Sequence, residues 1–242
     1  MEITGKVFCL FEQSGIFKNA FKDFGISASD VDICNSFGET DYVLDIFREI
    51  ESAYVGERSI FDYIFVKDLV IAFFPCIYFE AQSQLLFSWS TRNYQKLTTR
   101  EKTQRIIERS EHRQRFYVLL IKLCTICKER GLRLIVENPF GSINYLRNNF
   151  LLKPAIIDTD RTLRGDMFKK PTAYWFINCE PTAGMSLRKR HRNKYVTEQQ
   201  GNRGGGMCSI PRSVVTADYA EAFIADYILG KQISTTQPTL NF

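Results

Sequence analysis

A cysteine and a glutamate each follow a strongly apolar run, and both belong to residue types that carry out covalent chemistry. The run 69–74 precedes Pro75 and Cys76, and the run 132–136 precedes Glu137. Nearly uninterrupted apolar runs are typical of strands covered on both faces of a parallel sheet. Ligands bind at the carboxyl edge of such sheets. The spacing therefore predicts one cleft in which a nucleophilic thiol and a proton-exchanging carboxyl group face each other.

The composition is that of a folded globular protein. The chain has 242 residues, of which 45% are hydrophobic and 24% charged, and its formal net charge is +5. These values exclude a disordered chain and allow one good core. The longest apolar run, between Asp68 and Glu80, is shorter than the roughly 20 residues of a membrane helix. The first residues lack the charged-then-apolar order of a signal peptide, so we expect a cytoplasmic protein.

Seven cysteines are spread along the chain, and most lie within apolar runs. In a chain of this length, that pattern indicates a reducing compartment rather than a disulfide framework. Cys124 and Cys127 have the spacing of a metal or redox motif, but the sequence has no second such pair and only two histidines. We expect these two thiols to pack in the core, and we predict no metal site.

Segments typical of strands and of helices alternate along the chain. Apolar runs predict strands at 7–11, 26–33, 69–74, 132–136 and 170–177, with a short strand or turn near 41–48. Three- and four-residue spacing predicts helices at 17–24, through Ile46 and Ile50, as one or two long helices packed on the sheet between 99 and 130, and at 218–229. This alternation is typical of an α/β, doubly wound architecture, in which a mostly parallel sheet carries helices on both faces.

The predicted organisation is one core with a short insertion. We assign residues 1–180 to the core, 181–212 to a basic, glycine-rich insertion or small recognition lobe, 213–230 to a terminal helix that returns to the core, and 231–242 to a tail. The insertion has seven basic residues and one acidic residue, a balance that suits a polyanion such as DNA. A solvated loop is the alternative. The candidate nucleic-acid contacts are Arg188, Lys189, Arg190, Arg192, Lys194 and Arg203.

Taken in order, these pieces resemble the cytosine-C5 DNA methyltransferases, especially the short phage and prophage type. Residues 10–21 are similar to the family's loop that cradles S-adenosylmethionine, and 74–76 (Phe-Pro-Cys) matches the block that holds the nucleophile. Residues 137–139 (Glu-Asn-Pro) resemble the family's glutamate–asparagine block, and 212–225 looks like its last motif. The resemblance covers roughly residues 7–230. It implies a class I methyltransferase-like Rossmann fold.

The resemblance also implies a role for each candidate residue. The implied catalytic residues are Cys76, Glu137 and Asn138, and the implied cofactor-binding residues are Phe11, Ser14, Gly15, Asp32, Asp45 and Phe74. Asp32 is similar to the acid that holds the ribose hydroxyls, and Asp45 falls where the family has an acid near the adenine. Asp32 lies 17 residues after Gly15, close to the roughly 20 residues seen in nucleotide-binding βαβ units.

The implied reaction methylates C5 of cytosine in duplex DNA, with the target base turned out of the stack. The Cys76 thiolate adds to C6, and a carboxyl group such as Glu137 delivers a proton or a hydrogen bond to the ring nitrogen N3. A buried core cysteine and a turn-capping carboxylate are the alternative readings of these two residues. The counterpart of the family's catalytic arginine pair is open: Arg161 with Arg164, or Arg203, are the candidates.

Two departures from the family pattern keep a second function open. Gln13 stands at what resembles the first glycine of the cofactor loop, and the bulky residues 77–80 follow Cys76. They favour a catalytically degenerate, methyltransferase-like module that binds nucleic acid or a protein partner. An amino-methyltransferase is a weaker third reading, because residues 73–76 lack the acid or asparagine before two prolines that such enzymes need.

Overall fold

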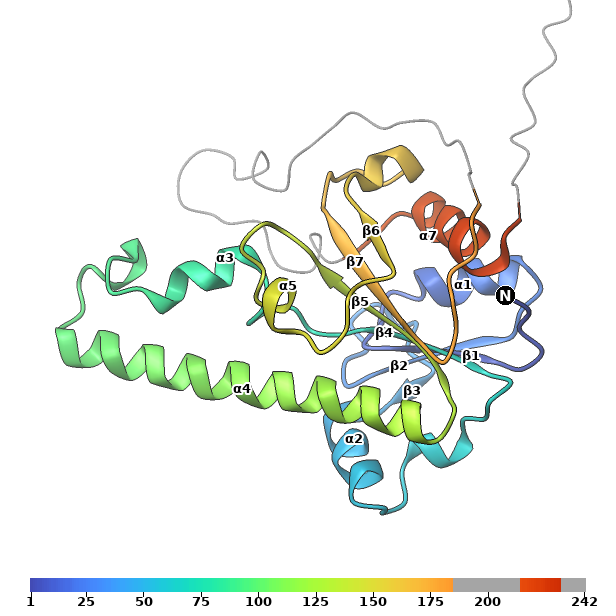
Figure 1. The fold of residues 1–242 in the computed structure, drawn as a ribbon, viewed down its shortest axis with the longest axis horizontal. Coiled ribbons are helices and arrows are strands. Elements are labelled where there is room, and N and C mark those ends of the chain that lie inside the picture. The colour runs from blue at the N-terminus through green and yellow to red at the C-terminus, as the bar shows by residue number, and fades with distance from the viewer. Residues whose placement is uncertain (185–213, 232–242) are drawn as a thin grey trace, which may run out of the picture.

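The computed structural model describes residues 1–184 and 214–231, which form an α/β fold around a central sheet (Figure 1). In this part of the chain, one sheet has the strand order β3-β2-β1-β4-β5-β7-β6. The strands are β1 (Val7–Leu10), β2 (Ala28–Asp32), β3 (Tyr42–Val43), β4 (Leu69–Phe73), β5 (Arg133–Pro139), β6 (Ile156–Asp158) and β7 (Thr172–Ile177). Neighbouring strands are parallel except that β7 runs antiparallel to β5 and β6. The expected α/β architecture with a mostly parallel sheet is confirmed.

Helices cover both faces of the sheet, as predicted. The longer ones are α1 (Ile16–Asp23), α2 (Ile46–Tyr54), α4 (Thr99–Glu129) and α7 (Ala217–Phe223), and α7 continues into the π-helical turn η5 (Ile224–Leu229). Successive side chains of a strand point to opposite faces. Cys9 and Ile71 therefore pack with α1 and α7 on one face, while Leu10 and Ala72 pack with α2 and α4 on the other. Because both faces are covered, β1 and β4 at the centre of the sheet are apolar throughout.

Several short elements were not predicted. They are β6, α3 (Ala81–Gln84), α5 (Tyr145–Asn149) and the 3₁₀ turns η1 (Ile60–Tyr63), η2 (Leu85–Phe87), η3 (Arg92–Tyr94) and η4 (Arg161–Arg164). Each is too short to show a helical or a strand period in the sequence. One of them, η4, carries Arg161, one of the candidate arginines.

α4 is one continuous helix that packs on the sheet along only part of its length. Its buried residues all lie between 119 and 127, and Gly131 follows its end with a φ of +67°. Ile107 is 45% exposed. The prediction that the whole apolar series packs on the sheet is therefore wrong for the N-terminal half, which extends beyond the sheet (Figure 1). Cys124 and Cys127 are buried in the packed half, as expected.

The strand order reverses between β1 and β4, which opens a crevice at their carboxyl ends. The chain leaves β1 through α1 on one face of the sheet, and it leaves β4 towards α4 on the other. The two connections separate above the sheet, and ligands of open α/β sheets bind at such points. Cys76 follows β4 and Glu137 belongs to the adjacent strand β5, so both candidate residues lie at this edge.

The predicted insertion, residues 181–212, lies outside the described residues except for 181–184. Within that stretch, the N–H of Thr182 donates to the carbonyl of Tyr227 at 2.9 Å, which fixes the chain to η5. The predicted terminal helix is present as α7 and η5, and Gly230 ends it with a φ of +65°. The predicted tail lies outside the described residues apart from Lys231. In the described ranges, no helix combines the length and the apolar character needed to cross a bilayer.

Candidate active-site cleft

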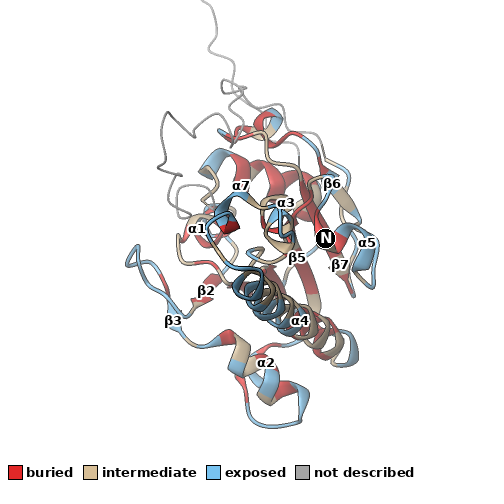
Figure 2. Cartoon of the chain, turned by 90° about the vertical axis from the view of Figure 1, so that its left-hand side faces the viewer, coloured by how far each residue is buried: buried red, intermediate tan, exposed pale blue. Residues whose placement is uncertain are grey.

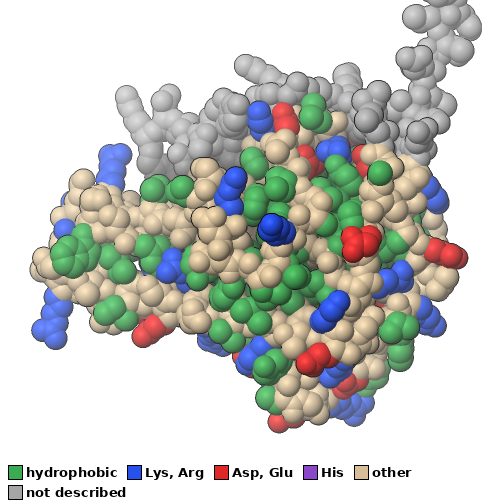
Figure 3. All heavy atoms as spheres, in the orientation of Figure 1, with side chains coloured by type: hydrophobic (Ala, Val, Ile, Leu, Met, Phe, Trp, Pro, Cys, Tyr) green, Lys and Arg blue, Asp and Glu red, His purple; other side chains and the backbone are tan. Residues whose placement is uncertain are grey.

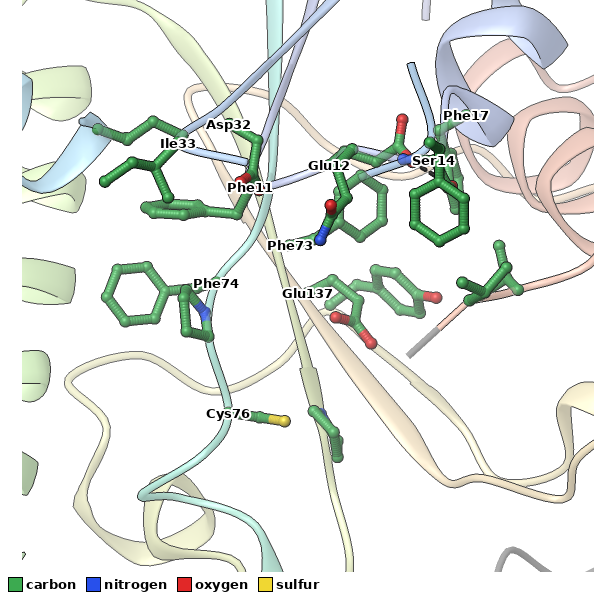
Figure 4. Close-up of a pocket in the computed structure, with 18 of the residues that line it drawn as sticks. Phe11, Glu12, Ser14, Phe17, Asp32, Ile33, Phe73, Phe74, Cys76 and Glu137 are labelled. Atoms are coloured by element: carbon green, nitrogen blue, oxygen red, sulfur yellow. Dashed lines mark hydrogen bonds between the residues drawn. The ribbon is translucent and has the colours of Figure 1, made fainter. Parts of the chain in front are cut away.

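A cavity of about 480 Å³ lies at the carboxyl edge of the sheet. Its walls come from the loops after β1, β2 and β4, from β5, and from η4 and the start of β7 (Figure 4). Segments that are distant in the sequence meet here because parallel strands end at one edge of the sheet. The volume lies within the range of small-molecule and cofactor pockets.

Cys76 and Glu137 both line this cavity, as the sequence predicted. Glu137 pairs in register with Phe73 across β4 and β5, and Cys76 lies just beyond the end of β4. Figure 4 shows the sulfur of Cys76 directed towards the strand that carries Glu137. One detail of the prediction is wrong: β5 does not end before Glu137 but continues through Pro139. The carboxyl group is therefore presented from a strand, a more rigid position than a loop.

Burial makes both groups weaker acids than usual. It raises the pKa of the Cys76 thiol to about 11, and it raises the pKa of the Glu137 carboxyl. Removal from water disfavours the charged form of each group. The charge of Lys170 is the largest influence that lowers the pKa of Cys76 and the pKa of Glu137. Arg161 also lowers the pKa of Glu137. At neutral pH the cavity therefore holds a neutral thiol.

Lys170 lines the cavity and was not predicted as a site residue. It lies just before β7, which runs antiparallel to β5, so the beginning of β7 reaches the edge of the sheet where the parallel strands end. The sequence signal was a Lys-Lys-Pro run before an apolar strand. That signal marks a strand entry, but it does not give the direction of the strand.

Among the candidate arginines, the structure brings Arg161 to the cavity. Arg161 is only 2% exposed, and its guanidinium forms an ion pair with the carboxylate of Asp166 and lies 4.6 Å from the ring centroid of Tyr219. These contacts fix a buried cation whose side chain reaches the cavity wall. Arg164 instead pairs with aspartates of β6 and η5, and Arg203 lies outside the described residues.

Most of the predicted cofactor residues belong to the same cavity as Cys76 and Glu137. Phe11, Ser14, Asp32, Asp45 and Phe74 all line it. The rings of Phe11 and Phe74 meet edge to face at 5.2 Å between centroids. Asp32 accepts a hydrogen bond from the N–H of Cys34 at 2.7 Å, and burial raises the pKa of its carboxyl. An acid at the end of the second strand beside two aromatic rings suits a ribose and a purine.

Gly15 and Asp45 also serve the local backbone. Gly15 has a φ of +72° at the start of α1, a conformation that side chains rarely adopt, so it shapes the loop after β1 without lining the cavity. Asp45 lines the cavity and also caps α2, where its Oδ1 accepts from the N–H groups of Phe47 at 3.1 Å and Arg48 at 3.3 Å. Both readings of Asp45, cofactor wall and helix cap, are compatible with these contacts.

Asn138, the third predicted catalytic residue, is placed differently from Cys76 and Glu137. Its side chain is fully buried, does not line the cavity, and donates from Nδ2 to the carbonyl of Phe74 at 2.8 Å. Alternate residues of β5 face opposite ways, so Glu137 reaches the cavity and its neighbour does not. In this structure Asn138 therefore lies outside the cavity lining, and its hydrogen bond holds the backbone that leads to Cys76.

The remaining predictions concern metals and nucleic acid. In the described part of the chain, no group of three or more His, Cys, Asp or Glu side chains is arranged to hold a metal ion. The six candidate nucleic-acid contacts of the insertion lie outside the described residues. Comparison of the sequence with models of known protein families found no match, and comparison with curated proteins found none either.

Proposed function

We propose that this protein is an S-adenosylmethionine-dependent DNA methyltransferase that methylates C5 of cytosine through a covalent bond to Cys76. The observation that carries the proposal is the cavity at the carboxyl ends of β4 and β5, which Cys76 and Glu137 line together. The reversal of strand order beside it supports the class I methyltransferase-like fold implied by the sequence resemblance.

The cavity fits the cofactor in size and in the chemistry of its walls. Asp32 offers a carboxylate for the ribose hydroxyls, and Phe11 and Phe74 offer aromatic surface for the adenine. Bound there, S-adenosylmethionine would supply an electrophilic methyl group. In the loop after β1, Phe11 adopts the left-handed region with a φ of +59°, and the Oε1 of Gln13 accepts from the N–H of Ser36 at 3.2 Å.

In the proposed reaction, the Cys76 thiol passes its proton to solvent, and its sulfur bonds to C6 of the target cytosine while the C5–C6 double bond opens. The protonated Glu137 donates to N3, so the electrons of the ring collect at C5, which then takes the methyl group. Arg161 adds a fixed positive charge beside the cavity, where it stabilises negative charge that develops on the ring. The C5 proton then passes to solvent, the S–C6 bond breaks so that the C5–C6 double bond forms again, and the proton on N3 returns to Glu137.

The direct test is to incubate varied duplex DNA with the protein and S-adenosylmethionine and to measure 5-methylcytosine by mass spectrometry of the nucleosides. We expect product with the unaltered protein and with Cys34→Ser, which changes an exposed cysteine. We expect none with Cys76→Ser. Absence of product across all DNA sequences would refute the proposal.

A second candidate is a methyltransferase-like module without activity, and the packing of the loop after Cys76 favours it. Phe79 is fully buried, and the ring of Tyr78 stacks on His112 with 5.6 Å between centroids. A loop fixed in this way moves less readily over a base than one of small polar residues. Calorimetry with S-adenosylmethionine separates the two candidates, because the degenerate module would give neither heat nor a shift in melting temperature.

A further inference from the structure

A projecting arm begins beside Cys76, and it is positively charged although the rest of the described chain is negatively charged. We define the arm as residues 81–117, which comprise α3, η2, η3 and the N-terminal half of α4. It extends beyond the sheet at the left of Figure 1, and Figure 2 views it from its free end, where exposed and intermediate residues face the viewer. The buried residues of α4 lie only between 119 and 127. The arm therefore contributes little to the core of the sheet.

Charge is strongly segregated between the arm and the rest of the described chain. The arm has eight basic and three acidic residues, whereas the remaining described residues have seventeen basic and twenty-three acidic ones. The arm therefore has a net charge of +5 and the rest of the described chain a net charge of −6. Figure 3 shows Lys and Arg side chains standing out from the arm. The exposed basic residues are Arg92, Lys96, Arg100, Arg105 and Arg115.

Contacts within the arm hold it together and do not involve the side chains of the five exposed basic residues. Arg113 lies 4.1 Å from the ring centroid of Phe87 in η2 and 4.6 Å from that of Tyr145 in α5. The hydroxyl of Tyr94 donates to the carbonyl of Leu86 at 3.0 Å. The cation–π contact of Arg113 with Phe87 fixes η2 against α4, and its contact with Tyr145 fixes the arm against the core. At the turn between η2 and η3, Trp89 is 57% exposed.

We propose that the arm binds the sugar–phosphate backbone of a nucleic acid, beside the cavity that takes the base. The part of α4 within the arm is about 28 Å long, at about 1.5 Å per residue, which matches roughly eight nucleotide steps. Opposite charge draws a phosphate chain to the arm, and an exposed tryptophan suits stacking on a base. An anionic membrane fits less well, because this half of α4 exposes Ile107 as its one large apolar side chain.

This inference rests on the proposed function, because it names the surface that holds the substrate. A measurement of binding tests it without any measurement of methylation. Each phosphate contact contributes about 0.9 to the slope of log affinity against log salt concentration. Removing three such contacts makes that slope shallower by about 2 to 3 and weakens binding at least about tenfold at 0.1 M salt. Substitution of exposed arginines changes the stability of a helix little.

The experiment measures fluorescence anisotropy of a labelled DNA duplex with the full chain over a range of salt concentrations. The test variant carries Arg92→Gln, Arg100→Gln and Arg105→Gln, and a second variant has Lys at the same three positions. The charge-matched control carries Gln at Lys22, Lys67 and Lys128, which are exposed positions at the opposite edge of the sheet. Thermal melting of every variant checks that each one is folded.

We expect the Gln variant of the arm to lose binding and salt dependence, while the Lys variant and the control stay within about twofold of the unaltered protein. Equal losses in the arm variant and the control would overturn the inference, because net charge alone would then explain binding. Loss of binding to anionic lipid vesicles, with DNA binding unchanged, would overturn it in favour of a membrane. Arm-dependent binding without 5-methylcytosine would support the inference and refute the proposed function. Methylation with arm-independent binding would do the reverse.

Discussion

Replacement of Lys170 by methionine should make the Cys76 thiol markedly less reactive. Burial raises the pKa of Cys76 to about 11, and Lys170 is the strongest charge that opposes this rise. At pH 8 only about one thiol in a thousand is ionised at such a pKa. A nearby opposite charge shifts a pKa by about one unit or more, so its removal leaves about tenfold less thiolate. The remaining thiolate is more nucleophilic, which reduces the expected loss of rate to about three- to fourfold.

The assay is alkylation by iodoacetamide between pH 7.5 and 9.5, followed by mass spectrometry of the peptide that contains Cys76. The exposed Cys34 provides an internal reference in the same sample. The matched control is Lys169→Met, because Lys169 lies next in the chain but does not line the cavity, and its Nζ is 3.8 Å from a carboxylate oxygen of Asp160. We expect the control to alkylate Cys76 at the unaltered rate. Equal rates in the two lysine variants would refute this account of the cavity.

Three further outcomes follow from buried polar contacts. Asn138→Ala removes the donor to the buried carbonyl of Phe74 and should lower the free energy of unfolding in urea by about 1–3 kcal/mol. Asp166→Asn leaves the buried Arg161 without its anionic partner and should lower the same quantity by about 3–5 kcal/mol, whereas a loss below about 1 kcal/mol would contradict the assignment. Burial raises the folded-state pKa of Glu137 above its unfolded value, so the unaltered protein loses stability as pH rises from the unfolded value through the folded one. The melting temperature of Glu137→Gln minus that of the unaltered protein should therefore be larger at pH 8 than at pH 4.5. If this difference is the same at both pH values, the account of Glu137 is wrong.

The part of the cleft built by parallel strands was predictable, and the part built by irregular chain was not. Cys76 and Glu137 follow or end apolar runs, and such runs mark buried strands whose carboxyl ends share one edge. Lys170 lines the same cavity because β7 runs antiparallel to β5, and Arg161 lines it because it lies in the short turn η4. Neither feature has a sequence period, because each depends on how the chain closes over the sheet after the strands are in place.

The arm was also only partly predictable from the sequence. The apolar positions of α4 follow a helical period along much of the helix, which predicts its existence correctly. A period says which face is apolar, but it does not say how much of that face meets the sheet. Only the segment 119–127 is buried, and Ile107 remains exposed. The charge distribution carried the missing information, since the basic residues concentrate in the half of α4 that leaves the core.

Burial has opposite consequences for the two reacting side chains of the proposed mechanism. A raised pKa suits Glu137, which must hold a proton to donate to N3, but it hinders Cys76, which must lose one. Lys170 lowers the pKa of both groups, and a carboxyl is the stronger acid. A cation strong enough to ionise the thiol in the empty cavity would therefore ionise Glu137 first and remove the donor that the ring needs. The proposed reaction thus requires the thiol to lose its proton only after the base has entered, when bond formation to C6 and donation to N3 proceed together. Lys170 then acts on the transition state, and its loss should slow methylation more than it weakens binding of DNA.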